Sequence, residues 1–446
     1  MARFEINEQK KYRFVDGIKI IPFRDDILVI SPHTANWIVL KSRKQLDVFN
    51  DFVYGKSIAE VLESHRYNSG DVSYVVAQIE ARKFTTKKIR RITDEKQSLH
   101  LYLTNLCNLH CPHCYMFSGK AEKEELTTEE IIKLLYDYRT IANGTQLTLS
   151  GGEPSMRSDF EKIVKESAKM GFNIKVLTNG SLMTKERVDK IAPYVSSVQI
   201  SIDGYSESSD ATIRGKGHFG KAVNAVDLFV EYGVETSVAI TPSWELLQNG
   251  MEEYKIFARE LIAKYNDKAF NVQFAEGLTA GRQINPTKEF NERYEARIKE
   301  LQAAVYNENY DLVSFIEGMS TGAILDNCMF GSLAISSVGD VYFCPEIGSV
   351  LPVDNIRYSS FAEIYKKAID AKKNTCISNL RPCKDCELMY ICGGGCRIKE
   401  FPALIKRKTF DKIDFSQIPP RNCSMAIKER FYEMMVESNE YLYMTL

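Results

Sequence analysis

Residues 99–117 read LHLYLTNLCNLHCPHCYMF, in which a short apolar run leads directly into Cys107, Cys111 and Cys114. The first five residues are typical of a β-strand, so the three cysteines occupy the loop that follows it. A structural zinc site is normally closed by four protein ligands, whereas this spacing, C-x3-C-x2-C, supplies three. Three cysteines can instead hold a [4Fe–4S] cluster that keeps one iron free for a small molecule.

The other cysteines are as unevenly placed as the first three. The chain has 446 residues and 11 cysteines, and the eight remaining cysteines all lie between positions 328 and 423. Such a sparse, odd number does not build a disulfide scaffold, and clustered thiols in a reducing cytosol bind metal or do redox chemistry. The soft ligand set indicates zinc or iron–sulfur. A zinc loop completed by His110 or His113 is therefore the alternative for the first cluster.

Composition and charge exclude several classes of protein. Lys and Arg number 58 and Asp and Glu 59, a formal net charge of −1, which argues against a nucleic acid as partner. No uninterrupted apolar run approaches the ~18 residues of a membrane span, and the N-terminus lacks the apolar region of a secretory signal. We therefore expect a cytoplasmic protein that engages no membrane.

The first part of the chain, up to about residue 90, predicts strands followed by helices. Alternating runs at 11–23, 25–32 and 36–42 are typical of a small antiparallel sheet. Helical patterns follow at 44–55, 57–66 and 69–84. Ser57 and Glu60 form a capping box, and Ser69 or Asp71 is expected to cap the last helix. This order and size indicate a winged-helix-like module.

The second part alternates strands with amphipathic helices. The predicted strands are Leu99–Leu103, Thr145–Leu149, Asn173–Thr178, Ser197–Ile202, Glu235–Ile240 and Asn271–Ala275. Six successive β/α units imply a parallel sheet, because each crossover needs a helix. Without an early G-x-G-x-x-G loop, the pattern favours a partial (β/α)6 TIM barrel, whose functional residues lie at the carboxyl ends of the strands.

The third part is turn-rich and cysteine-rich, and it ends in a helical pattern at 425–443. Its cysteines follow the pattern C328-x10-G339-x4-C344, then C383-x2-C386-x5-C392-x3-C396, then C423. The predicted fold class is thus α/β, with a partial barrel between a small N-terminal domain and a Cys-rich C-terminal domain. The predicted domains are 1–95, 96–315 and 316–446.

A second motif, Gly151-Gly152-Glu153-Pro154, follows the second barrel strand. Paired glycines let the backbone approach a ligand closely, and a carboxylate can receive an ammonium group. Together with the three-cysteine loop, this motif resembles the radical S-adenosylmethionine (SAM) enzymes. The resemblance implies a cluster on Cys107, Cys111 and Cys114 that binds SAM and cleaves it reductively to methionine and a 5′-deoxyadenosyl radical.

The same resemblance assigns further residues to SAM. It implies that Gly151, Gly152 and Glu153 bind the methionyl amine, and that Ser201 and Arg214 hold the SAM carboxylate or ribose. No residue is assigned as the general base.

The third part resembles the SPASM extension of radical SAM enzymes, which binds two auxiliary [4Fe–4S] clusters, three clusters in all. The outer cluster is then held by Cys383, Cys386, Cys392 and Cys423, and the inner one by Cys328, Cys344 and Cys396. With three ligands, the inner cluster keeps an open iron able to bind a substrate thiolate, unless Cys376 supplies the fourth ligand.

Residues 10–90 resemble the peptide-recognition module of maturases that act on ribosomally made peptides. Such a module captures a leader peptide as an added edge strand. The resemblances imply a radical SAM/SPASM maturase that installs a thioether, from a Cys sulfur to a carbon of another residue, in a precursor peptide whose core enters the barrel. The implied electron donor is a flavodoxin or ferredoxin. Carbon–carbon crosslinking, epimerisation, sulfatase maturation and a non-catalytic iron–sulfur peptide carrier are the alternatives.

Overall fold

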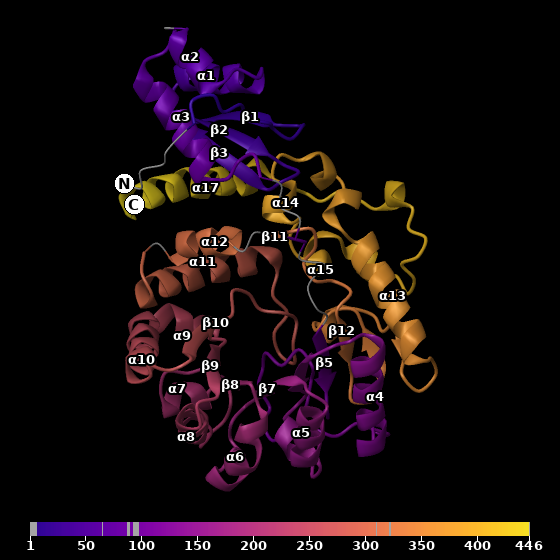
Figure 1. Ribbon diagram of the computed structural model, residues 1–446. Coiled ribbons are helices and arrows are strands. Elements are labelled where there is room, and N and C mark those ends of the chain that lie inside the picture. Colours follow the sequence, from indigo (N-terminus) through magenta and orange to yellow (C-terminus); the bar gives the residue numbers. More distant parts are fainter. Residues whose placement is uncertain are drawn as a thin grey trace.

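The computed structural model describes residues 7–64, 66–86, 90–91, 98–308, 310–320 and 323–445. Figure 1 shows an N-terminal sheet with helices at the top, a curved barrel sheet at the bottom and a C-terminal part that connects the two. The predicted fold class, an α/β chain built around a partial barrel, is confirmed.

The N-terminal part is a three-stranded antiparallel sheet followed by three helices. Its elements are β1 (Lys19–Phe23), β2 (Asp26–Ser31), β3 (Asn36–Leu40), α1 (Arg43–Val53), α2 (Ile58–Glu63) and α3 (Ser69–Ala81). Alternation along β2 gives the sheet two buried faces, because successive side chains point to opposite sides. Val29 packs with the helices, and Leu28 and Ile30 pack with the C-terminal part.

The starts of α2 and α3 test two predicted helix caps. The capping box is present: Ser57 Oγ accepts the Glu60 N–H at 3.2 Å, and Glu60 Oε2 accepts the Ser57 N–H at 2.6 Å. For α3 the prediction of Ser69 or Asp71 is wrong, because Asn68 is the cap. Its Oδ1 accepts the Asp71 N–H at 2.7 Å, whereas Ser69 is already the first helical residue.

The central part contains all six predicted strands, each within one residue of its predicted bounds. They are β5 (Ser98–Tyr102), β6 (Gln146–Ser150), β7 (Asn173–Thr178), β8 (Ser197–Ser201), β9 (Glu235–Ile240) and β10 (Phe270–Phe274). The helices are α4 (Thr128–Ile141), α5 (Phe160–Lys169), α6 (Lys185–Ile191), α7 (Glu207–Ala211), α8 (Phe219–Glu231), α9 (Trp244–Asn249), α10 (Met251–Lys264) and α11 (Lys288–Val305). Neighbouring strands are parallel, so their carboxyl ends meet at one mouth.

The barrel sheet continues beyond β5 into the C-terminal part. Strand β12 (Leu333–Ile335) pairs in parallel with β5, and the antiparallel strands β13 (Asp340–Tyr342) and β14 (Asp354–Asn355) extend the sheet to nine strands. The cysteine-rich part is therefore bonded directly to the strand that leads into the first cysteine cluster.

Helices make up most of the remaining C-terminal part. They are α12 (Tyr310–Ser320), α13 (Phe361–Asn374), α14 (Met389–Cys392), α15 (Arg397–Glu400), α16 (Pro402–Ile405) and α17 (Met425–Thr445). Strand β4 (Arg90–Arg91) pairs in parallel with β11 (Ala323–Ile324). The predicted domain boundary after residue 95 lies outside the described residues, and the one after residue 315 falls inside α12.

Helix α17 ties the two ends of the chain together. It runs along the N-terminal sheet (Figure 1), where Met435 is buried in one core with Trp37 and Met389. Its Asn439 Oδ1 accepts the side-chain N–H of Gln78 from α3 at 2.9 Å. The N-terminal module is thus packed on the cysteine-rich part.

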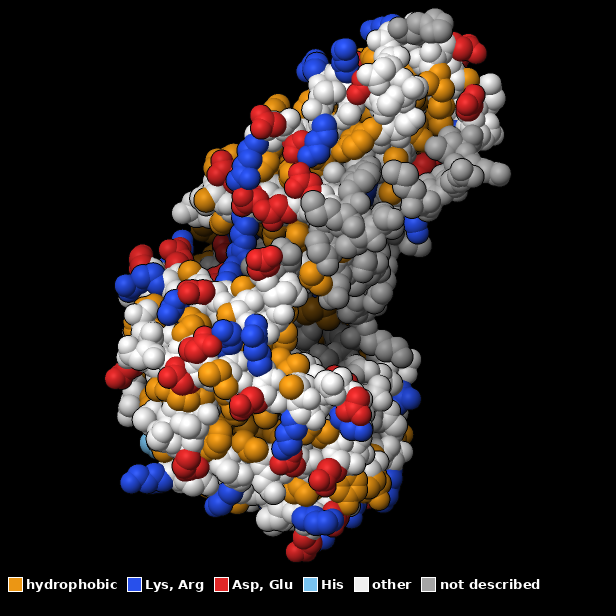
Figure 2. Space-filling model, turned by 90° about the vertical axis from the view of Figure 1, so that its left-hand side faces the viewer, with side chains coloured by type: hydrophobic (Ala, Val, Ile, Leu, Met, Phe, Trp, Pro, Cys, Tyr) orange, Lys and Arg blue, Asp and Glu red, His pale blue; other side chains and the backbone are white. Residues whose placement is uncertain are grey.

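The surface carries charges of both signs. Figure 2 shows Lys and Arg side chains interspersed with Asp and Glu over the described part of the visible face, without a broad basic area. Among the described helices, none is both long and apolar enough to cross a membrane.

Candidate functional site

A cavity of about 380 Å³ lies at the mouth of the barrel. Its lining comes from the loops after β5, β6, β7, β8, β9 and β10, and from Glu346 of the C-terminal part. The cysteine loop contributes Cys107, Cys111 and Cys114 together. The structure thus places the first cysteine cluster where the sequence predicted it, facing the mouth.

Burial favours the neutral form of Cys107 and Cys111 in the protein alone. It raises the pKa of Cys107, and it raises the pKa of Cys111 to about 11 against the opposing charge of Arg214. A thiol bound to a metal is deprotonated, because the cation stabilises the thiolate by more than burial destabilises it. The site therefore needs the positive charge of a metal centre to hold its cysteines as thiolates.

The placement of the side chains fits a cluster better than a single ion. In the described part of the chain, no three His, Cys, Asp or Glu side chains converge as they do around one metal ion. The three thiols nevertheless affect one another electrostatically and share one cavity, as ligands spread around a cluster do. His113, a proposed zinc ligand, is engaged elsewhere: its Nε2 lies 3.3 Å from Asp203 Oδ2.

The two glycines of the GGEP motif form a cradle against the cysteine loop. The Gly152 N–H donates to Thr104 O at 2.8 Å, and the Glu153 N–H donates to Leu106 O at 2.8 Å. A Cβ on Gly151 would lie 2.4 Å from Thr104 O, and one on Gly152 would lie 2.4 Å from Leu106 O. Side chains cannot fit at that distance, so only glycines allow the two loops to line one cavity.

The Glu153 carboxylate lies in the wall behind this cradle. It is fully buried and accepts four hydrogen bonds: from the Ser155 N–H at 3.2 Å and hydroxyl at 2.5 Å, from Thr178 Oγ1 at 2.8 Å and from the Asn179 N–H at 2.7 Å. Direct contact of Glu153 with the methionyl amine stays a prediction. What the geometry shows is that its carboxylate joins the loops after β6 and β7.

Replacing Glu153 by alanine should therefore cost stability. We expect the free energy of unfolding to fall by about 3 kcal/mol, because unpaired buried donors cost about 1–3 kcal/mol each and part of that cost is relieved by water. Chemical denaturation under anaerobic conditions measures the change. Glu186→Ala, an exposed glutamate bonded to Lys190, is the control and should leave the midpoint unchanged. A Glu153→Ala midpoint equal to that of the wild type would contradict the bracing role.

Ser201, at the end of β8, and Arg214 line the same cavity. Arg214 is almost completely buried, and its Nε lies 2.7 Å from Asp203 Oδ2. The Asp203 Oδ1 accepts the Thr241 N–H at 2.9 Å, so the carboxylate joins the loops after β8 and β9. Asp203 is a positioning group for Arg214 that the sequence did not assign. The roles of Ser201 and Arg214 toward SAM stay predictions.

The inner cysteines meet beside β12. The Cys328 thiol hydrogen-bonds to Cys396, and Cys344 lies close enough to Cys396 for its pKa to be raised by that neighbour, after burial. Backbone N–H groups at the start of α15 donate to Cys396 Sγ, and the Arg397 N–H donates to Cys328 Sγ at 3.3 Å. These donors suit sulfurs that carry negative charge.

The outer cysteines also come together. Burial raises the pKa of Cys383, and the neighbouring thiols of Cys392 and Cys423 raise it further. Lys428 of α17 lies near both Cys386 and Cys423. Arg421 donates to Cys392 Sγ at 3.4 Å. The division of these cysteines between an inner and an outer cluster stays a prediction.

Cys376, the alternative fourth ligand, lies at the end of α13. Its Sγ is 3.4 Å from Lys372 O and 3.9 Å from Asp326 Oδ2. Arg397, which is fully buried, lies near both Cys376 and Cys328. Whether Cys376 binds iron stays a prediction.

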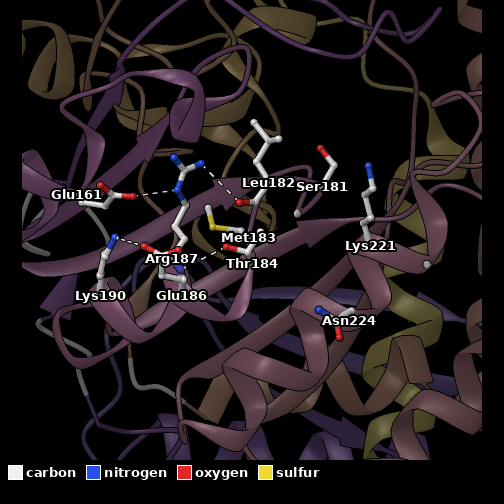
Figure 3. Close-up of a pocket in the computed structure, with 12 residues that line it drawn as sticks. Glu161, Ser181, Leu182, Met183, Thr184, Glu186, Arg187, Lys190, Lys221 and Asn224 are labelled. Atoms are coloured by element: carbon white, nitrogen blue, oxygen red, sulfur yellow. Dashed lines mark hydrogen bonds and ion pairs between the residues drawn. The ribbon is translucent and has the colours of Figure 1, made fainter.

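A second hollow, of about 650 Å³, lies outside the barrel between α6 and α8 (Figure 3). Its charged side chains pair with one another: Arg187 Nε lies 2.9 Å from Glu161 Oε1, and Lys190 Nζ lies 2.7 Å from Glu186 Oε1. No cysteine lines it. The smaller cavity at the barrel mouth, where the thiols converge, is therefore the candidate site.

Comparison with known proteins agrees with this geometry. Residues 101–242 match the radical SAM superfamily, and residues 327–387 match the SPASM iron–sulfur cluster-binding domain. The chain is 28% identical over 295 residues to the sporulation killing factor maturation protein SkfB of Bacillus subtilis strain 168, covering 64% of this chain and 69% of that protein. It is 28% identical over 312 residues to the mycofactocin maturase MftC of Mycolicibacterium smegmatis, covering 67% and 77%.

The fold has solved counterparts as well. Native anSMEcpe with bound AdoMet superposes with a TM-score of 0.55 at 20% identity, covering 77% of this chain and 99% of that one. The half-barrel and the C-terminal part that extends it thus share their fold with that protein. Residues 101–242 thus form a radical SAM domain and residues 327–387 a SPASM domain, and the cofactors are SAM and [4Fe–4S] clusters. When bound, these cofactors supply the 5′-deoxyadenosyl radical that abstracts hydrogen.

Sequence reasoning missed two features of this site. Glu346 lines the cavity although it lies more than 230 residues from the cysteine loop. His218 connects the loops after β7 and β8, with Nδ1 at 2.6 Å from Asp210 Oδ2 and Nε2 at 2.7 Å from Asn179 O. The parallel pairing of β12 with β5 brings Glu346 in, and no local spacing signals it.

Proposed function

We propose that the chain is a peptide maturase that installs a thioether in a ribosomally made precursor, joining a Cys sulfur to a carbon of another residue. The observation that carries the proposal is the joint placement of two cysteine sites. The inner set has three cysteines, one short of a complete cluster set, and it adjoins the cavity of the first cysteine loop through the segment Cys344–Glu346.

Two tyrosines connect the segments that carry the two sites. The Tyr102 hydroxyl, at the end of β5, donates to Pro345 O and lies 3.2 Å from the Tyr115 hydroxyl. Tyr115 follows Cys114 in the chain. A peptide in the cavity would therefore lie beside the first cysteine site and beside Glu346, two residues after Cys344, which supports a reaction that uses a carbon and a sulfur of one substrate.

The names of the relatives point to the same class of substrate. SkfB is a maturation protein for the sporulation killing factor, and MftC is a mycofactocin maturase. We therefore take a precursor peptide as the substrate, with its leader bound by the N-terminal module and its core in the barrel. A flavodoxin or ferredoxin is the proposed electron donor.

The proposed reaction balances as follows. A hydrogen atom leaves the acceptor carbon for the deoxyadenosyl group, and the thiol loses its proton. The C–S bond forms, and one electron is left for an iron–sulfur acceptor. The peptide thus loses two hydrogens and one free thiol.

We expect mass analysis to show this loss after co-expression with short, cysteine-containing reading frames next to the gene. The product should be two hydrogens lighter, and iodoacetamide should no longer alkylate the joined cysteine. A peptide that loses two hydrogens but keeps every thiol would show carbon–carbon crosslinking instead. An unchanged mass with deuterium taken up from D2O would show epimerisation. Either result, or the absence of deoxyadenosine, contradicts the thioether proposal.

A further inference from the structure

The segment after Cys344 is fixed between the two cysteine sites. The Glu346 N–H donates to Cys344 Sγ, and Pro345 O accepts the Tyr102 hydroxyl. A Cβ on Gly348 would lie only 2.8 Å from Tyr115 O, so this turn packs closely on the residue that follows Cys114. The backbone that carries Glu346 therefore has little freedom to move.

The Glu346 side chain lies where the two sites meet. Glu346 is the one acidic residue among the described residues that line the cavity. Burial raises the pKa of this carboxylate, and the nearby sulfur of Cys396, of the inner set, raises it further. The positive charge of Lys399 acts in the opposite direction. Among the residues that the structure describes, no donor forms a hydrogen bond to this carboxylate.

A carboxylate two residues after Cys344 and within electrostatic reach of Cys396 has the chemistry of an iron ligand. Cysteine sulfur is the usual ligand of cluster iron, and carboxylate oxygen is a ligand of iron in other protein sites. The inner set supplies three sulfurs, one fewer than the irons of a [4Fe–4S] cluster. We propose that Glu346 is the fourth protein ligand of the inner auxiliary cluster, bound through a carboxylate oxygen. This rests on the proposed assignment of Cys328, Cys344 and Cys396 to one cluster.

With Glu346 as the fourth ligand, a substrate thiolate has a defined binding position on the inner cluster. Carboxylate oxygen is a harder ligand than thiolate sulfur and suits cluster iron less well. A peptide thiolate that enters the cavity can replace it: the iron–oxygen bond breaks, an iron–sulfur bond forms, and the carboxylate leaves as an anion toward Lys399. Glu346 thus closes the site in the absence of peptide and opens it to a thiol.

The experiment measures ligation without any peptide. In a Cys107→Ala, Cys111→Ala, Cys114→Ala background, electron paramagnetic resonance of the reduced protein reports the auxiliary clusters alone. We expect Glu346→Gln to change the signal of one cluster and to lower the Kd for added cyanide at least tenfold, because the iron is no longer covered. Glu346→Cys should supply a fourth thiolate and abolish cyanide binding.

Two variants serve as controls. Glu276→Gln changes an exposed carboxylate after β10 that does not line the cavity, and it should alter neither the signal nor cyanide binding. Cys376→Ser should likewise have no effect. Equal iron and sulfide contents in all variants show that both auxiliary clusters are assembled.

The proposal is overturned if Glu346→Gln has the signal and the cyanide Kd of its parent, or if Cys376→Ser rather than Glu346→Gln alters them. Its failure is distinguishable from failure of the proposed function. Crosslinking by the wild type with an unaltered Glu346→Gln signal rejects ligation alone. An altered signal with no crosslinking by the wild type rejects the thioether reaction alone.

Discussion

Replacing Cys107, Cys111 and Cys114 together by alanine is expected to abolish the release of 5′-deoxyadenosine from SAM and dithionite, down to the background of the assay. All three side chains leave one loop after β5 and line one cavity. Among the described residues that line the cavity there is no other thiol, and the imidazole of His113 or the carboxylate of Glu346 suits cluster iron less well than a thiolate does. Chromatographic analysis of the nucleoside measures the effect.

The fold should survive this triple change. Strand β5 is held on one side by β6 and on the other by β12, and the cysteines lie beyond its end. Iron content should fall by about one third, since one of three proposed four-iron clusters is lost. Cys376→Ser is the matched control and should keep both iron and activity. Deoxyadenosine formed by the triple variant at the wild-type rate would show that the reacting cluster lies elsewhere.

The barrel could be predicted closely because its signals are local. Each strand is a short apolar run between amphipathic helices, and parallel pairing follows from that alternation. The position of Cys107, Cys111 and Cys114 at the mouth follows from their place directly after a strand. The inner and outer cysteine sets are implied by the resemblance to SPASM domains; in the structure Cys328 lies beside Cys396, and Cys383 lies near Cys392 and Cys423.

What the sequence did not predict depends on contacts between distant segments. Nothing in the run 333–335 indicates that it pairs with 99–101, yet this pairing brings Glu346 to the barrel mouth. The GGEP motif also does not indicate that the Glu153 carboxylate accepts four hydrogen bonds from the segments after β6 and at the end of β7. A motif reports which residues occur together, and only packing shows which atoms face the cavity.

The cavity also depends on the absence of a side chain at Gly152. Replacing Gly152 by alanine is expected to lower the free energy of unfolding by about 2–3 kcal/mol, the usual cost of overpacking. The new Cβ would lie 2.4 Å from Leu106 O and 2.8 Å from Asn105 O, which are backbone atoms. They cannot turn away as the end of a side chain can, and Leu106 O is held by the Glu153 N–H.

The added methyl group should therefore push the GGEP segment away from the cysteine loop. Since both segments line the cavity, we expect SAM affinity and deoxyadenosine formation to fall at least tenfold, measured by equilibrium dialysis and nucleoside analysis. Gly220→Ala, in the first turn of α8, is the matched control because its Cβ would meet open space. Alanine is the better helix former, so this control should be neutral or stabilising by about 0.5–1 kcal/mol. A Gly152→Ala variant that binds SAM as tightly as Gly220→Ala would show that SAM does not depend on the contact between these two loops.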